Sequence, residues 1–116
     1  MKKIVALAIA ALASAVSLNA AAGNVKAGEE AAKKYNCASC HGADYNTPID
    51  PSYPKLAGQH RDYLEHSLLA YQRGAGGANG RGNAIMGAQV KPLSKKDIKD
   101  IAAYLNSLPG TLVLKK

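Results

Sequence analysis

The segment Cys37-Ala38-Ser39-Cys40-His41 constrains this chain more than any other stretch. Two cysteines stand three residues apart, and a histidine directly follows the second. On one helical turn these side chains are neighbours, because positions three and four apart share a face. The pattern is the attachment signature of c-type haem, in which each sulfur forms a thioether with one vinyl group and the histidine binds the iron. The motif therefore predicts one covalent haem c, with His41 as a metal ligand.

Two other uses of such a cysteine pair fit this chain poorly. A thioredoxin-like redox centre needs strands alternating with helices, and no such pattern surrounds Cys37 and Cys40. A tetrahedral zinc site needs a fourth ligand, and without a second cysteine pair the candidates are His60 and His66. Haem attachment is therefore the interpretation that we favour.

Residues 1–22 have the pattern of a secretory signal peptide. Two lysines precede an uncharged apolar run at residues 4–16, and small residues follow as far as Ala22. Cleavage after Ala22 matches the small-x-small pattern of such sites, and cleavage after Ala20 is the near alternative. An uncleaved membrane anchor is disfavoured, because the run is too short to span a bilayer comfortably. We therefore expect an exported, periplasmic protein in which residues 23–116 form a single domain.

The charge of the chain constrains its partners. Fifteen Lys and Arg residues against eight Asp and Glu residues give a formal net charge of +7, and the balance stays positive without the two lysines of the signal peptide. The chain has no arginine-rich stripe of the kind that binds nucleic acid. We therefore expect acidic protein surfaces or anionic lipid as partners, no nucleic acid, and no stable membrane insertion after cleavage.

Apolar residues recur at helical spacing in three segments, at about 26–35, 59–73 and 94–108. Ser94 and Asp97 form a capping box that opens the third segment. No extended alternation of the kind expected for strands competes with these patterns. The sequence predicts an all-α fold of three to four helices.

Two connections between these segments lack a periodic pattern. Residues 42–58 contain Pro48, Pro51 and Pro54 among Asp and Asn residues, which predicts a loop long enough to wrap around the edge of a haem. Residues 74–82 contain five glycines and predict a flexible connection. The spacing of these glycines does not match a phosphate-binding fingerprint.

The second axial ligand is less constrained than the first. Met86 is the only methionine besides the initiator, and it lies in residues 83–87, which we expect to be irregular. A thioether presented there fits the distal face of a haem, whereas a methionine that fills a core gap is the common alternative. His60 and His66 are the rival ligands. We favour Met86 as the second metal ligand.

Ligation by Met86 distinguishes two functions. With both axial positions filled, the iron changes between ferrous and ferric states without a bond being made or broken, which suits an electron carrier rather than an enzyme. If Met86 is not bound, the iron is open to small molecules, and the alternative is a small haem enzyme or a gas-ligand sensor. We expect the electron carrier.

The haem motif and the methionine before the last helix resemble the class I c-type cytochromes, in their small bacterial form with one haem. The resemblance covers residues 24–110. Residues 53–59, which read YPKLAGQ, are similar to the segment that follows the haem motif in this family. The resemblance implies that the carbonyl of Pro54 accepts the ring N–H of His41 and that Leu56 packs on the porphyrin.

The same resemblance implies a cytochrome c fold wrapped around one covalently bound haem, in which the first and last helices cross. In this family a glycine on one crossing helix lets an aromatic residue on the other approach, and Gly28 and Tyr104 are the matching positions. Redox-partner proteins with acidic docking surfaces, such as an oxidase, a reductase or a dehydrogenase, are the partners it implies. Lysines that are candidate members of the docking rim are Lys33, Lys34, Lys55 and Lys91.

Overall fold

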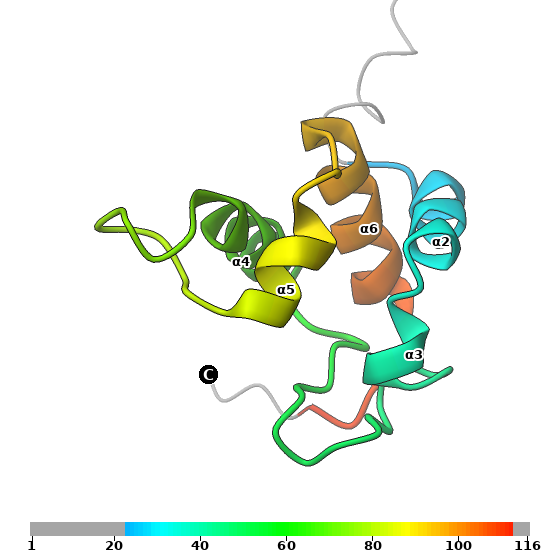
Figure 1. Cartoon of the computed structure of the whole chain (residues 1–116). Coiled ribbons are helices and arrows are strands. Elements are labelled where there is room, and N and C mark those ends of the chain that lie inside the picture. The colour runs from blue at the N-terminus through cyan, green and yellow to red at the C-terminus, as the bar shows by residue number, and fades with distance from the viewer. Residues whose placement is uncertain (1–22, 113–116) are drawn as a thin grey trace, which may run out of the picture.

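The computed structural model describes residues 23–112, which contain helices and no strand (Figure 1). This confirms the all-α prediction. In chain order the helices are α2 (Val25–Lys34), α3 (Ala38–His41), α4 (Arg61–Arg73), α5 (Ala84–Val90) and α6 (Lys95–Ser107). The described part thus has five helices where three to four were expected, because the haem motif forms a turn of its own and α5 was not predicted. The expected signal peptide and its cleavage site lie outside the described residues.

Helix α2 is short and amphipathic, as predicted. It begins after Asn24, which has an extended backbone and caps the helix with its side-chain Oδ1, the acceptor of the Ala27 N–H at 2.8 Å. Gly28 and Ala32 form its buried side. The helix therefore presents its smallest residues to the rest of the domain.

Helices α2 and α6 cross at Gly28 (Figure 1). A Cβ atom at Gly28 would collide with the carbonyl of Asp100 and would lie 2.8 Å from the Cβ of Tyr104. The buried carboxylate of Asp100 also accepts the N–H of Asn24 at 2.8 Å, which ties the start of α2 to α6. The close approach expected of Gly28 and Tyr104 is present, and it accounts for a glycine inside a helix.

Helix α6 provides the centre of the core. The predicted capping box opens it: the Ser94 hydroxyl accepts the N–H of Asp97, and the Asp97 carboxylate accepts the N–H of Ser94. Its buried apolar residues are Ile98, Ile101, Ala102, Ala103 and Leu105. These residues pack against α2 on one side and α4 on the other.

Helix α4 begins at Arg61 rather than at Gln59, because His60 is extended with a ψ of 131°. Its buried residues are Leu64 and Ala70, and it contacts both α5 and α6. Helix α4 therefore packs against both the central helix α6 and α5, the short helix that carries Met86 (Figure 1).

The prediction that residues 83–87 are irregular is wrong. Asn83 is extended and its side-chain oxygen accepts the N–H groups of Ile85 and Met86, which starts helix α5. The helix has seven residues, of which Val90 alone is buried. One buried position gives no helical period, which explains why the sequence pattern did not reveal it.

No helix within residues 23–112 is both long enough and apolar enough to cross a membrane.

Candidate functional site

Two adjoining cavities lie between the loop at residues 42–58 and helices α3, α4, α5 and α6. Both are lined by His41, Pro54, Leu56, Leu68, Tyr71, Met86 and Leu105. The first also includes both cysteines, and the second opens toward Tyr63 and Arg81. All six residues that the sequence nominated for a haem site therefore lie around one continuous region.

The Cys-x-x-Cys-His motif forms the first wall of this region. Cys40 and His41 donate their backbone N–H groups to the carbonyl of Cys37 at 3.3 and 3.1 Å, so the motif folds as a single helical turn. Gly42 ends the turn with a φ of +94°, and a Cβ atom there would collide with the carbonyl of Thr47. The turn thus brings the three side chains of the motif together at the cavity.

A hydrogen bond to Pro54 fixes the ring of His41. The Nδ1 atom lies 2.9 Å from the Pro54 carbonyl oxygen, which is the contact that the family resemblance implies. A carbonyl can only accept, so Nδ1 carries the proton and Nε2 is left with its lone pair. His41 is 6% exposed, and its free nitrogen is therefore available to a metal within the cavity.

Tyr45 holds the segment that carries Pro54 in place. The Tyr45 carbonyl accepts the N–H groups of Leu56 and Ala57 at 2.8 and 3.0 Å. Its ring is buried and meets Tyr104 edge-on, with 5.9 Å between centroids. Burial, which disfavours the charged phenolate, raises the pKa of Tyr45 to about 12. This buried tyrosine links the loop that presents Pro54 to helix α6.

A tight turn precedes this segment in the same loop. The Asp44 carboxylate accepts the N–H groups of Asn46 and Thr47 at 2.9 Å each, and the Thr47 hydroxyl at 3.0 Å. These donors favour the charged form and hold the pKa of Asp44 below its ordinary value. The loop is long, but its hydrogen bonds give it a defined path back to the cavity.

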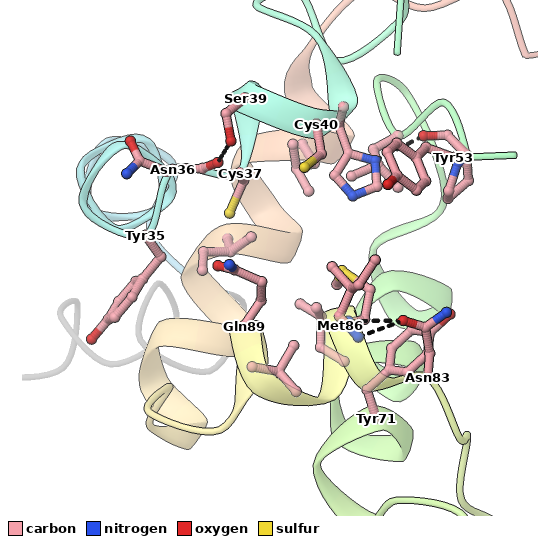
Figure 2. Close-up of a pocket in the computed structure, with 18 of the residues that line it drawn as sticks. Tyr35, Asn36, Cys37, Ser39, Cys40, Tyr53, Tyr71, Asn83, Met86 and Gln89 are labelled. Carbon is pink, nitrogen blue, oxygen red and sulfur yellow. Dashed lines mark hydrogen bonds between the residues drawn. The ribbon is translucent and has the colours of Figure 1, made fainter. Parts of the chain in front are cut away.

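Met86 lies on the opposite wall, on α5. Figure 2 shows Met86 across the cavity from Cys37 and Cys40, with Gln89 and Tyr71 on the same side as Met86. Met86 is half-buried. The rival ligands His60 and His66 are exposed and line neither cavity.

The cysteines do not form a recognisable redox or zinc centre. Burial raises the pKa of the Cys37 thiol, whereas catalytic thiols in redox centres have lowered values. Within residues 23–112 no group of three or more His, Cys, Asp or Glu side chains is placed to hold a metal ion. A tetrahedral zinc site therefore has no ligand set in the described part of the chain.

The family model described as "Cytochrome c" matches residues 25–109 of this chain. The chain belongs to the cytochrome c family. A second comparison agrees: this cytochrome is 43% identical over 86 residues to cytochrome c-554(548) of Halomonas halodenitrificans, covering 74% of this chain and 98% of that one. The family-model match, residues 25–109, spans the motif, the loop and the last helix.

This cytochrome is also similar to proteins named cytochrome c4. It is 41% identical over 96 residues to cytochrome c4 of Stutzerimonas stutzeri, covering 79% of this chain and 44% of the relative. The solved structure of reduced recombinant cytochrome c4 from Pseudomonas stutzeri matches 78% of this chain with a TM-score of 0.67 and 39% identity, and 48% of that structure is covered. The chain thus spans less than half the length of these two cytochromes c4.

The cytochrome's cavity fits the haem c that this family carries through two cysteines. Both thiols, an imidazole with a free nitrogen and a thioether line it, and the remaining wall is largely apolar.

The sequence did not reveal part of the cavity wall. Leu68 and Tyr71 belong to the apolar residues that recur at helical spacing in the predicted helix at 59–73, but this spacing does not say that a cavity rather than a protein core faces them. Nothing in the sequence marked Arg81 as part of the cavity wall, because it is a single residue in a glycine-rich segment.

Proposed function

We propose that this cytochrome is an exported electron carrier with one haem c, in which His41 and Met86 are the two axial ligands. The observation that carries the proposal is the position of Met86, which lines the same cavity as Cys37, Cys40 and His41 but comes from the opposite wall. An imidazole and a thioether on opposite sides of a thioether-linked group form the ligand pair of electron-transfer cytochromes.

Each residue has a separate task in this proposal. Cys37 and Cys40 hold the haem covalently, and His41 binds through Nε2 because its Nδ1–H is donated to Pro54. Leu56 would pack on the haem, and Met86 would bind the iron from the side opposite His41 and so keep small molecules away from it. The haem itself supplies a one-electron change between ferrous and ferric iron.

The ligand pair and the apolar wall both favour the reduced form. A soft thioether opposite an imidazole raises the reduction potential compared with two imidazoles. Burial among Leu56, Leu68 and Leu105 acts in the same direction, because the oxidised centre carries more charge than the reduced one. His41 on one wall of the cavity and Met86 on the other are both held in place by the protein, so little rearrangement would accompany electron transfer.

Partners in this proposal are redox proteins with acidic docking surfaces. Of the candidate rim lysines, Lys55 lines the second cavity and Lys34 lies 5.3 Å from the ring of Tyr35, which lines the first. Lys33 pairs with Glu29 at 2.9 Å, which leaves it less able to attract a partner. We therefore place the docking rim around Lys34 and Lys55 rather than Lys33.

Export follows from the signal-peptide pattern of residues 1–22, and with it a periplasmic location for residues 23–116 as a single cytochrome domain. Fractionation of spheroplasts, with intact mass to locate the cleavage after Ala20 or Ala22, tests this part. Recovery of the haem-bearing chain in the cytoplasm would contradict it.

Absorption spectra of the mature protein test the ligand pair. We expect a sulfur-to-iron charge-transfer band in the oxidised protein and no response of the reduced protein to carbon monoxide. Met86→Ala should abolish the band, open the site to carbon monoxide and lower the potential, whereas Ile85→Ala, a neighbour on the same helix, should keep the band. Ready binding of carbon monoxide by the unmodified protein would instead favour a haem enzyme or gas sensor.

A further inference from the structure

The segment before Met86 presents a mechanical problem. Residues 74–80 project away from the rest of the domain (Figure 1), and a Cβ atom added at Gly74, Gly76 or Gly77 would meet nothing within 4 Å. Met86 follows only six residues after Gly80. A distal ligand close to so open a loop needs an anchor between the two.

Arg81 provides contacts of that kind. Its backbone N–H donates to the carbonyl of Ala70 on α4 at 2.9 Å. Its guanidinium carbon lies 5.6 Å from the ring centroids of both Tyr63 and Tyr71, and Nη2 donates to the Tyr63 hydroxyl at 3.3 Å. The glycine-rich segment is thus joined to α4 one residue before its end at Gly82.

A short series of contacts connects Arg81 to Met86. Asn83 follows two positions later, and its side-chain oxygen accepts the N–H groups of Ile85 and Met86 at 3.0 and 2.9 Å. Tyr71, one of the two rings against Arg81, lines the cavity beside Met86. The start of α5 is therefore positioned by side chains of α4.

The other end of α5 is also held by α4. The side-chain amide of Gln72 donates to the carbonyls of Val90 and Leu93, at 2.8 Å each. Val90 is the last residue of the helix and is 1% exposed. Gln72 therefore donates to the carbonyl of the last residue of α5 and to one carbonyl just beyond it, where carbonyls have no N–H donor within the helix.

We propose that α4 clamps α5 at both ends, with Arg81 and Gln72 as the positioning residues that keep Met86 in the cavity opposite the haem motif. A helix of seven residues is too short to be stable by itself, and one buried residue gives it little packing energy. The clamp also isolates Met86 from the open glycine-rich loop. This inference rests on the proposed ligation by Met86 and extends it to the residues that maintain it.

Two Arg→Leu variants form a matched pair for the test. Arg73 ends α4 and donates its Nε and Nη2 to the carbonyl of Asn79, so it contacts the loop, but it lines neither of the cavities that Met86 lines. Arg73→Leu and Arg81→Leu remove the same charge next to the same loop. We expect Arg81→Leu to raise the rate of carbon monoxide binding to the reduced protein on the order of tenfold, which corresponds to the loss of two cation–π contacts. Arg73→Leu should leave the rate at the wild-type value.

Gln72→Leu tests the other end of the helix. It should accelerate carbon monoxide binding to a similar extent, on the order of tenfold, because two hydrogen bonds are lost. Arg81→Lys keeps the charge without the planar stacking, so we expect a rate between those of the wild type and Arg81→Leu. The double substitution Gly76→Ala and Gly77→Ala should have no effect on the rate.

Heating distinguishes positioning from general stability. In Arg81→Leu and Gln72→Leu the sulfur-to-iron band should disappear at a lower temperature than the helical circular dichroism, whereas a purely structural role would shift both together. If Arg81→Leu does not fold, Arg81→Lys and Gln72→Leu give the answer by the same two measurements.

The outcomes separate this inference from the function on which it rests. A wild-type protein whose spectrum is the same as that of Met86→Ala would overturn the ligation itself. If the wild type has the band but Arg81→Leu and Gln72→Leu bind carbon monoxide as slowly as Arg73→Leu, the clamp is wrong and the electron carrier stands. An equal acceleration by Arg73→Leu or by the glycine pair would overturn the isolation of Met86 from the loop.

Discussion

The two walls of the cavity are built in different ways. The wall with His41 comes from one continuous stretch, in which the motif folds as a turn on itself and the ring of His41 bonds to Pro54 thirteen residues later. The wall with Met86 is a seven-residue helix with one buried residue, and α4 contacts Arg81 shortly before this helix and Val90 at its end. The first wall depends on what is adjacent along the chain, whereas the second depends on packing.

The largest expected effect tests whether the first wall alone retains the haem. Replacing Cys37 and Cys40 together with alanine should abolish covalent haem, because no thioether can form, whereas Met86→Ala should keep it. Intact mass and haem staining after denaturing electrophoresis measure this. Ser39→Ala, within the same turn, is the control and should retain haem. Covalent haem in the double cysteine variant would break the comparison.

The next effect concerns how tightly the surroundings of each wall are packed. Gly28→Ala should lower the free energy of unfolding by about 3 kcal/mol, because the added Cβ meets the α6 backbone that supports the cavity. Gly87→Ala in α5 meets nothing within 4 Å and should raise it by about 0.5–1 kcal/mol through helix propensity. Denaturant unfolding of the two variants gives the values. Equal effects would show that α5 is packed as closely as α2.

A smaller effect should appear at alkaline pH in the wall with His41. The pKa of Tyr45 rises from its ordinary value of 10.0 to about 12 in the folded protein, so its contribution to stability is complete below pH 10 and is lost as the pH rises toward 12. Tyr45→Phe has no proton to lose and should lack this component, on the order of 2 kcal/mol. Unfolding free energies measured from pH 9 to 12 for both proteins test it. Parallel curves would contradict the assignment.

The smallest effect lies at acidic pH in the same loop. The pKa of Asp44 is below its ordinary value of 3.8, so its contribution to stability is present above that pH and is lost as the pH falls. Asp44→Ala should therefore reduce the acid dependence of unfolding slightly, with little change in the carbon monoxide rate. Asp62→Ala, in the first turn of α4, serves as a control of equal charge. An increase in the carbon monoxide rate in Asp44→Ala would mean that the two walls are coupled.

Some contacts could be predicted because each depends on a few residues with distinctive chemistry. The capping box of Ser94 and Asp97 joins neighbours in the chain, and a glycine inside a helix, Gly28, has few explanations other than a close approach. The contact between His41 and Pro54 came from the resemblance to a family and not from spacing. The all-α fold followed from the helical periods of three segments.

Other features could not be predicted, because their stability comes from distant partners. Helix α5 has no periodic pattern, and its cap Asn83 was visible only as one polar residue in a glycine-rich region. Arg81 and Gln72 look like ordinary solvated residues until α4 places rings and carbonyls beside them. Residues 74–82 were expected to form a flexible connection, yet Arg81 near the end of this segment makes four tertiary contacts.

The sequence by itself determined the haem motif, the positive net charge of the chain and those helices that are long enough for apolar residues to recur at helical spacing. These properties depend on residues within a few positions of one another, where covalent spacing sets the geometry. The tertiary structure decided that a short helix carrying Met86 faces His41 across one cavity, and that α4 holds it there. That decision depends on contacts between segments far apart in the chain, and no local spacing encodes them.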